Sequence, residues 1–263
     1  MANGSSSSGA TKGGAGGGLG DGHNRGGKGP EIGKMPAKKA PFRPFKEYQK
    51  EFERTKDAQS LKKVLEDNGV PISDKLEKYI VTGKYPIEQA KLFIKGSLLT
   101  ISHYGEGNKF LGFGAFMDSN SGTVAFYRAP TITGAQSNGV IAVNIGHPKS
   151  RTKEIYGTGA HEGYHHVQGV LGDATNQSMN RYSENVVASV YPKWVKKARI
   201  TTGNIKTDFA AYVSMYGASS NAEALSEAMK NVIMKKGKAS TLSKDIFKQV
   251  RADAKRNKTG KYK

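Results

Sequence analysis

The chain has 263 residues, no cysteine, and 41 Lys or Arg against 22 Asp or Glu, which gives a formal charge of +19. The absence of cysteine excludes disulfides, thiolate metal sites and cysteine nucleophiles. Only 36% of the residues are hydrophobic and the mean hydropathy is −0.58, so we expect part of the chain to lie outside a packed core. No apolar run reaches the roughly 18 residues that span a bilayer, and residues 1–40 lack the apolar segment of a signal peptide. We therefore expect no membrane span and no signal-dependent export.

Residues 1–40 consist largely of Gly, Ser and Lys. Such a segment buries too little apolar surface to offset the entropy lost on ordering, so it predicts a disordered arm. A solvated linker and a tail used for docking, packaging or delivery both fit this composition.

Residues 41–96 predict small amphipathic helices that pack on a core. Ser73 is a plausible N-cap with Gly83 just beyond the end of its helix, and Pro86 stands at a first-turn position of the next helix. This region shows no motif that carries chemistry.

Residues 97–146 contain short aromatic and β-branched runs separated by turn sequences, which predict a small antiparallel sheet: SLLTISHY, KFLGFGAFM, TVAFYRA and GVIAVNI. From about Ser150 the periodicity is helical to near the end of the chain. Strands followed by a run of helices indicate an α+β domain, which we place at residues 97–250, followed by a basic tail at 251–263.

The motif that carries chemistry is His161-Glu162-Gly163-Tyr164-His165, which has the form H-E-x-x-H. Residues at i and i+4 share one helix face, so both imidazoles can reach one Zn²⁺. Glu162, one step around the helix, can take a proton from a water bound to the metal. A surface helix with two solvated histidines is the alternative. The neighbouring His166, also at i+4 from Glu162, could support the ligands or contact a substrate, but we expect it to be simply exposed.

A catalytic zinc site requires a third protein ligand. The acidic candidates downstream are Asp173, Glu184, Asp208, Glu223 and Glu227. Glu184 follows His165 after 18 residues, a separation found in thermolysin-like enzymes. Glu223 and Glu227 stand at i and i+4 on one helix face, although Ser220 and Glu223 also fit a capping box. The residues alone leave these candidates open.

The segment SMYGASSNAEALSEAM resembles the Tyr-Gly-x-x-x-Asn-x-Glu-x-x-x-Glu element of lethal-factor-like zinc metallopeptidases, the anthrax toxin type. It is equally similar to the C-terminal metallopeptidase-type domain of phage minor head proteins. The resemblance covers roughly residues 97–250 and implies a zincin-like fold of the gluzincin class. It implies that Glu223 completes the zinc site, that Tyr216 stabilises the oxyanion of the tetrahedral intermediate, and that Glu227 supports the ligands.

The resemblance also implies a peptide-binding edge strand. The run GVIAVNI resembles the strand that such enzymes pair with an extended substrate, which assigns substrate contacts to Ile141, Val143 and Ile145. The predicted function is a zinc-dependent endopeptidase acting on proteins or peptides, in a phage particle or as a delivered toxin-type protein.

The basic tail suggests a competing hypothesis. Residues 230–263 hold twelve Lys or Arg and two acids, a net charge of +10. A solvated helix with a frayed end and a non-specific nucleic-acid contact both fit this charge. In the competing hypothesis the protein is a non-enzymatic virion or nucleic-acid-associated protein whose zinc site is vestigial or structural.

Overall fold

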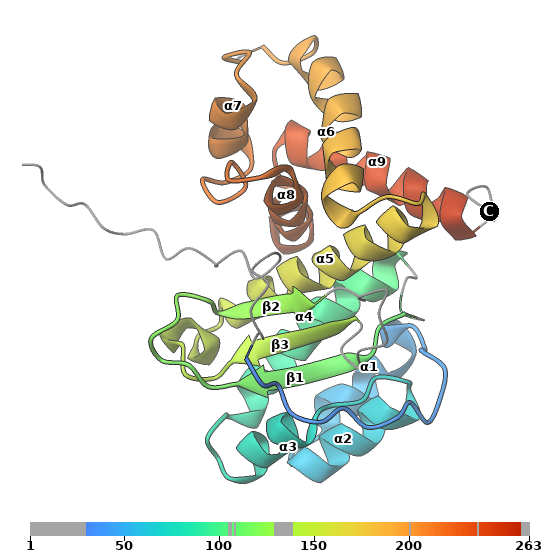
Figure 1. The fold of residues 1–263 in the computed structure, drawn as a ribbon, viewed down its shortest axis with the longest axis vertical. Helices are drawn as coiled ribbons and strands as arrows, with labels where there is room; N and C mark the ends of the chain where they lie inside the picture. The colour runs from blue at the N-terminus through green and yellow to red at the C-terminus, as the bar shows by residue number, and fades with distance from the viewer. Residues whose placement is uncertain are drawn as a thin grey trace, which may run out of the picture.

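The computed structural model describes residues 30–104, 107, 109–128, 139–199, 201–235 and 237–258. Within these residues the protein has nine α-helices, one short 3-10 helix and a three-stranded sheet (Figure 1). The expected α+β class is therefore confirmed. No helix in the described ranges is long and apolar enough to cross a membrane.

Four helices precede the sheet and five follow it. The first group is α1 (Phe45–Arg54), α2 (Ala58–Asp67), α3 (Asp74–Val81) and α4 (Ile87–Tyr104). The strands are β1 (Gly112–Phe116), β2 (Ala125–Arg128) and β3 (Val140–Asn144), followed by the 3-10 helix η1 (Pro148–Arg151). The second group is α5 (Ile155–Ala174), α6 (Met179–Val195), α7 (Ile205–Tyr212), α8 (Asn221–Lys235) and α9 (Thr241–Lys258).

The sheet is mixed, and the prediction of an antiparallel sheet is wrong for one of its pairs. The strand order is β1-β3-β2, with β3 parallel to β1 and antiparallel to β2. The run SLLTISHY is not a strand but the C-terminal half of α4. The sequence pattern of this segment predicts a strand because α4 is buried on most of its surface. Even Ser97 and Thr100 are buried beside Leu98 and Ile101. A helix without an exposed stripe shows no clear 3.6-residue polar period.

The predicted edge strand lies in the centre of the sheet. β3 is paired on both sides, so an extended peptide cannot add to it. Ile141, Val143 and Ile145 are fully buried core residues that face the helices. Their assignment as substrate contacts on an edge strand is wrong. Among the described residues, the outer side of β1 is bonded to Pro71, Ser73 and Ile32, so the edge of the sheet without such partners belongs to β2.

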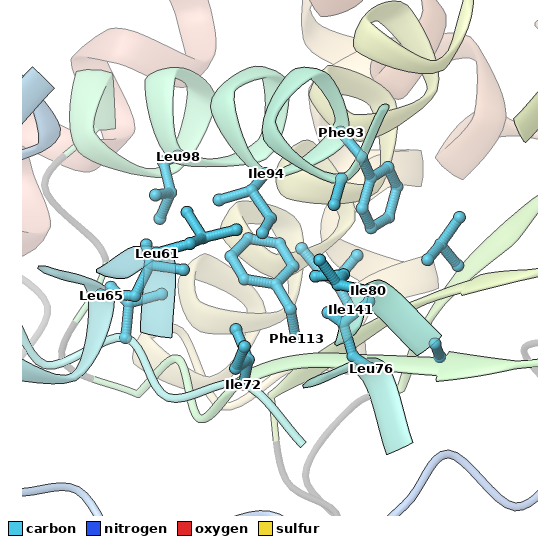
Figure 2. Close-up of a cluster of buried hydrophobic side chains, with 14 of the residues drawn as sticks. Leu61, Leu65, Ile72, Leu76, Ile80, Phe93, Ile94, Leu98, Phe113 and Ile141 are labelled. Atoms are coloured by element: carbon cyan, nitrogen blue, oxygen red, sulfur yellow. The ribbon is translucent and has the colours of Figure 1, made fainter. Parts of the chain in front are cut away.

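Two hydrophobic cores flank the middle of the molecule. In the first, Phe113 and Ile141 from the sheet pack against side chains of α2, α3 and α4 (Figure 2). The second lies among α5, α6, α7, α8 and α9 and includes Trp194. α5 contributes to both cores, so its motif residues are held between them.

α4 and α5 approach each other closely through glycines. A Cβ atom on Gly159 would lie 2.1 Å from the Phe93 carbonyl oxygen, and one on Gly163 would lie 2.7 Å from that of Ser97. The Ser97 hydroxyl donates a hydrogen bond to the Gly159 carbonyl at 2.8 Å. Gly159 and Gly163 are therefore explained by contact between the two helices, although each costs roughly 1 kcal/mol in helix propensity.

The described residues differ from the predicted arm and from the predicted domain boundaries. Residues 1–29 lie outside the described residues, whereas residues 30–40 are described and contain no helix or strand. Ile32 is only 6% exposed, and its carbonyl accepts hydrogen bonds from Ala115 N–H and the Ser73 hydroxyl. The arm prediction is thus wrong for this stretch. The boundary at residue 97 falls inside α4, and α9 continues through residue 251 to Lys258.

Candidate metal centre

The H-E-x-x-H motif lies in the middle of α5, as its spacing predicts. His161, Glu162 and His165 are 1%, 3% and 1% exposed, so the alternative of two solvated surface histidines is wrong. Their burial results from the position of α5 between the sheet and α8 (Figure 1).

The fold brings Glu223 of α8 to both histidines. His161 Nε2 and His165 Nε2 are 3.0 Å apart. Glu223 Oε2 lies 2.9 Å from His161 Nε2, and Glu223 Oε1 lies 3.4 Å from His165 Nε2. Ser220 still caps α8, because its hydroxyl accepts the Glu223 N–H at 3.2 Å, while the Glu223 carboxylate points to the histidines. These three side chains form a buried group that could hold a metal ion.

The other acidic candidates lie elsewhere. Glu184 is exposed and pairs with Arg181 at 3.0 Å. Asp173 is half exposed at its side chain and lies 3.4 Å from Lys109. Asp208 accepts hydrogen bonds from Thr201, Thr202 and Tyr191 near the start of α7. None of the three approaches the histidines.

Each histidine ring is held from its far side. Glu227 Oε1 lies 2.9 Å from His161 Nδ1, and Lys230 forms an ion pair with the same carboxylate. This is the supporting position that the family resemblance implies for Glu227. A ring whose Nδ1 is held by an acceptor presents its Nε2 lone pair to a metal.

Gln168 and Ser226 hold the second ring, and neither appears among the sequence-predicted residues. Gln168 Oε1 lies 2.7 Å from His165 Nδ1, and Ser226 Oγ lies 3.0 Å from the same atom. Helical spacing is the feature of the sequence that could have identified them. Gln168 stands three residues after His165, and Ser226 three residues after Glu223, so each pair shares one helix face. Lys230, three residues after Glu227, follows the same rule.

The charges of the centre are strongly coupled. Burial alone would lower the pKa of His161, but the carboxylates of Glu223 and Glu227 outweigh it and raise that pKa to about 10. Burial likewise opposes ionisation of Glu223, yet the two histidines hold its pKa well below the usual range. For Glu227, the hydrogen bond with His161 overcomes burial and lowers the pKa to about 2. Both carboxylates are thus suited to act as charged ligands or ligand supports.

Glu162 faces the free edge of the sheet. Burial raises its pKa, and the backbone N–H of Tyr127 donates a hydrogen bond to its carboxylate. The Asn144 N–H donates a hydrogen bond to the Val124 carbonyl at 2.8 Å, so Val124 bonds to the β3 side. Along an antiparallel strand the backbone N–H and C=O groups of successive residues point alternately toward and away from the partner strand. The backbone groups of Ala125 and Tyr127 therefore point away from β3. The carboxylate therefore lies beside the outward-facing backbone of β2.

Two other side chains, Tyr216 and His166, lie near the motif. Tyr216 is half-buried in the loop before α8, and its ring centroid lies 5.8 Å from that of His161. His166 is fully buried between the rings of Phe110 and Tyr127, so the expectation that it is exposed is wrong.

The donor set and its spacing fit Zn²⁺. Two imidazoles and a carboxylate are ligands that zinc takes in catalytic sites. Ligands about 2.0–2.1 Å from a tetrahedral zinc lie about 3.3 Å apart, close to the 2.9 to 3.4 Å between these atoms. Glu223 Oε2 is also buried, and when the Nδ1 of His161 carries the ring proton toward Glu227, its neighbour His161 Nε2 has no proton to donate, which a cation between them would remedy.

Comparison with known proteins found no relative: no family model, no curated protein and no solved structure matches this chain. The resemblance to lethal-factor-like zinc metallopeptidases therefore stays a prediction from the motif residues. The geometry of His161, His165, Glu223 and Glu162 is the independent basis for a functional proposal.

Proposed function

We propose that this protein is a zinc-dependent endopeptidase of the gluzincin class with a zincin-like fold. The observation that carries the proposal is the buried convergence of His161, His165 and Glu223 beside Glu162. Two helices that are distant in the sequence supply this group, and both histidines are oriented from behind. Such an arrangement is typical of a site built for a metal and a proton acceptor together.

In this proposal His161, His165 and Glu223 hold Zn²⁺. Zinc in such a site polarises a carbonyl and lowers the pKa of a bound water to roughly 7. Glu162 takes a proton from the attacking water and delivers it to the leaving amine. Burial raises the pKa of Glu162, which suits a group that both accepts and donates a proton.

Tyr216 is proposed as the donor to the developing oxyanion. Its ring centroid lies 5.8 Å from that of His161 and the side chain is half-buried, so the ring lies next to a proposed ligand. Removal of one such donor typically costs roughly 3 kcal/mol of transition-state stabilisation.

The substrate is proposed to lie along the outer edge of β2. The backbone groups of Ala125 and Tyr127 face away from β3, and Tyr127 also reaches Glu162. Ala125 and Tyr127 are 3% and 1% exposed, and the Tyr127 N–H is bonded to Glu162. A peptide added to this edge has to displace that bond, and it would then lie directly beside the proton acceptor. The substrate-binding strand is therefore β2 rather than β3.

A purely structural zinc site accounts less well for the same geometry. Structural zinc sites have four protein ligands, whereas the candidate group among the described residues has three. A structural site also needs no acidic residue such as Glu162 beside its ligands. These two features favour catalysis over the competing hypothesis.

Zinc content tests the proposal directly. We expect purified protein to contain close to one zinc per chain, and His161→Ala and Glu223→Ala to lose it. The matched control is Glu184→Ala, which removes the exposed carboxylate that stands at the thermolysin-like separation from His165. This variant should keep the metal. Absence of zinc from the wild type after reconstitution would refute the proposal, and retention by Glu223→Ala would refute the ligand set.

A further inference from the structure

A second feature of the molecule lies away from the metal centre, where the end of α4 meets α9. Here the surface forms a hollow of about 480 Å³, which we call the α9 hollow. Its lining is supplied by two elements and is listed as His103, Tyr104, Lys248, Arg251, Ala252, Ala254, Lys255 and Lys258. Hollows of this volume are in the range that binds ligands.

The charge of the α9 hollow is of one sign. Its lining has four Lys or Arg side chains and no carboxylate among the described residues. Lys248 has an acidic neighbour outside the lining, since its Nζ lies 3.8 Å from Asp245. The remaining acid of α9, Asp253, is buried on the other side of the helix and is bonded to Tyr182 and Arg256.

The cations form a regular stripe along α9. Lys244, Lys248, Arg251, Lys255 and Lys258 follow one another at spacings of four, three, four and three residues. Residues at these spacings share one helix face. The opposite face carries the apolar residues Leu242, Ile246, Val250 and Ala254, which pack into the second core. The stripe therefore faces outward along the whole helix.

Helix stability alone does not account for the stripe. Like charges three or four residues apart destabilise a helix, and α9 has four such neighbouring pairs. The helix dipole favours cations in the last turn, which explains Lys255 and Lys258. It disfavours a cation in the first turn, where Lys244 stands without an acidic residue. The stripe is thus better explained by an anionic partner.

His103 forms part of the opposite wall of the α9 hollow. Burial lowers the pKa of His103, and the nearby charges of Arg251, Lys46 and Lys258 lower it further. The imidazole ring also packs against Phe247, with centroids 5.2 Å apart. This wall of the hollow therefore presents the neutral imidazole ring of His103 near several cationic side chains.

We propose that the α9 hollow and the cationic stripe bind the phosphate backbone of nucleic acid without sequence specificity. The five cations extend over 14 residues of helix, or about 21 Å, which exceeds the reach of a compact phosphorylated metabolite. An extended row of evenly spaced phosphates matches that length. The charge of the whole chain, +19, favours the same partner.

Salt-dependent binding of a labelled duplex of about 20 base pairs tests this proposal, with the full chain and fluorescence anisotropy between about 50 and 200 mM salt. The test variant is Lys248→Gln/Arg251→Gln/Lys255→Gln/Lys258→Gln. The control variant is Lys193→Gln/Lys196→Gln/Lys197→Gln/Arg199→Gln, which removes the same charge from exposed positions of α6 and the turn after it. Zinc content of both variants keeps this proposal separate from the peptidase proposal.

The slope of log affinity against log salt concentration is negative, and we expect its magnitude to decrease by about three to four in the test variant. The control should change that slope by less than about one. Equal losses in both variants, or none in the test variant, would overturn the proposal. It would also be overturned if the four cations governed binding of tripolyphosphate or phosphatidylserine vesicles but not of the duplex.

Discussion

Gln168 orients His165: its Oε1 lies 2.7 Å from the ring Nδ1, while its Nε2 donates to the Ala222 carbonyl at 2.9 Å and to the Ser183 hydroxyl at 3.2 Å. Because the amide N–H groups are engaged by α6 and α8, the amide oxygen is left for the ring. His165 Nδ1 is thereby held as a donor, and Nε2 is directed toward His161 and Glu223. One side chain thus links three helices to the orientation of a ligand.

Replacement of Gln168 by Met should weaken zinc binding by roughly 10- to 100-fold, because the ring loses the acceptor that fixes it. Gln168→Glu keeps an acceptor at the same place and should retain most of the affinity. The measurement is zinc competition with a chromophoric chelator, with circular dichroism as the check on folding. Gln177→Met, which removes an exposed hydrogen bond with Asn185, should bind zinc normally. Unchanged affinity in folded Gln168→Met would contradict the positioning role.

Gly159→Ala should destabilise the protein, since its Cβ would lie 2.1 Å from the Phe93 carbonyl oxygen and would force α4 and α5 apart. We expect a loss of about 1 to 3 kcal/mol in the free energy of unfolding. The matched control is Gly157→Ala in the same helix, whose Cβ would meet nothing closer than Lys230 Cδ at 3.6 Å. That change should stabilise by up to about 1 kcal/mol.

Urea unfolding of the two alanine variants measures both changes. If Gly159→Ala proved as stable as Gly157→Ala, the close approach of α4 and α5 would not exist in solution.

Asp208 should make stability depend on pH in the acid range. Burial opposes its ionisation, but hydrogen bonds from Thr201, Thr202 and Tyr191 outweigh burial and lower the pKa to about 2. A carboxylate with a depressed folded pKa stabilises the protein above its unfolded pKa of about 3.9, and this stabilisation is lost as pH falls through about 2.

The corresponding variant is Asp208→Asn, which we expect to be less stable than the wild type at pH 7. The difference between the two melting temperatures should shrink as pH falls from about 4 toward 2. Thermal melts across this range provide the measurement. A difference that is independent of pH would show that the charge of Asp208 has no part in holding the segment before α7.

The α5 residues of the candidate metal centre could be predicted because their spacing is a local property. H-E-x-x-H fixes the relation of His161, Glu162 and His165 within little more than one helical turn, independent of the remaining fold. Glu223 lies on a different helix, so spacing alone left it among five candidates. The family resemblance points to it, and the packing of α8 on α5 brings its carboxylate to both histidines. Gln168 was missed because glutamine has many uses and a helix position does not reveal which neighbour its amide meets.

The sheet shows where a single sequence is insufficient. The buried run Val140–Asn144 has the same composition whether its strand is central or at an edge, because pairing partners are distant in the chain. The prediction of a strand for the C-terminal half of α4 is wrong for another reason. Burial on several sides removes the 3.6-residue repeat of polar positions that identifies a helix. Both errors come from tertiary contacts that the local sequence does not show.

Glu162→Gln tests the central claim most directly, with zinc content and cleavage of an unstructured protein such as casein measured on the same preparation. Gln has nearly the same shape but cannot accept the proton, so the variant should keep its zinc and lose activity by about a hundredfold or more. The control is Glu184→Gln, which should retain both zinc and activity. Full activity of zinc-loaded Glu162→Gln would contradict the account.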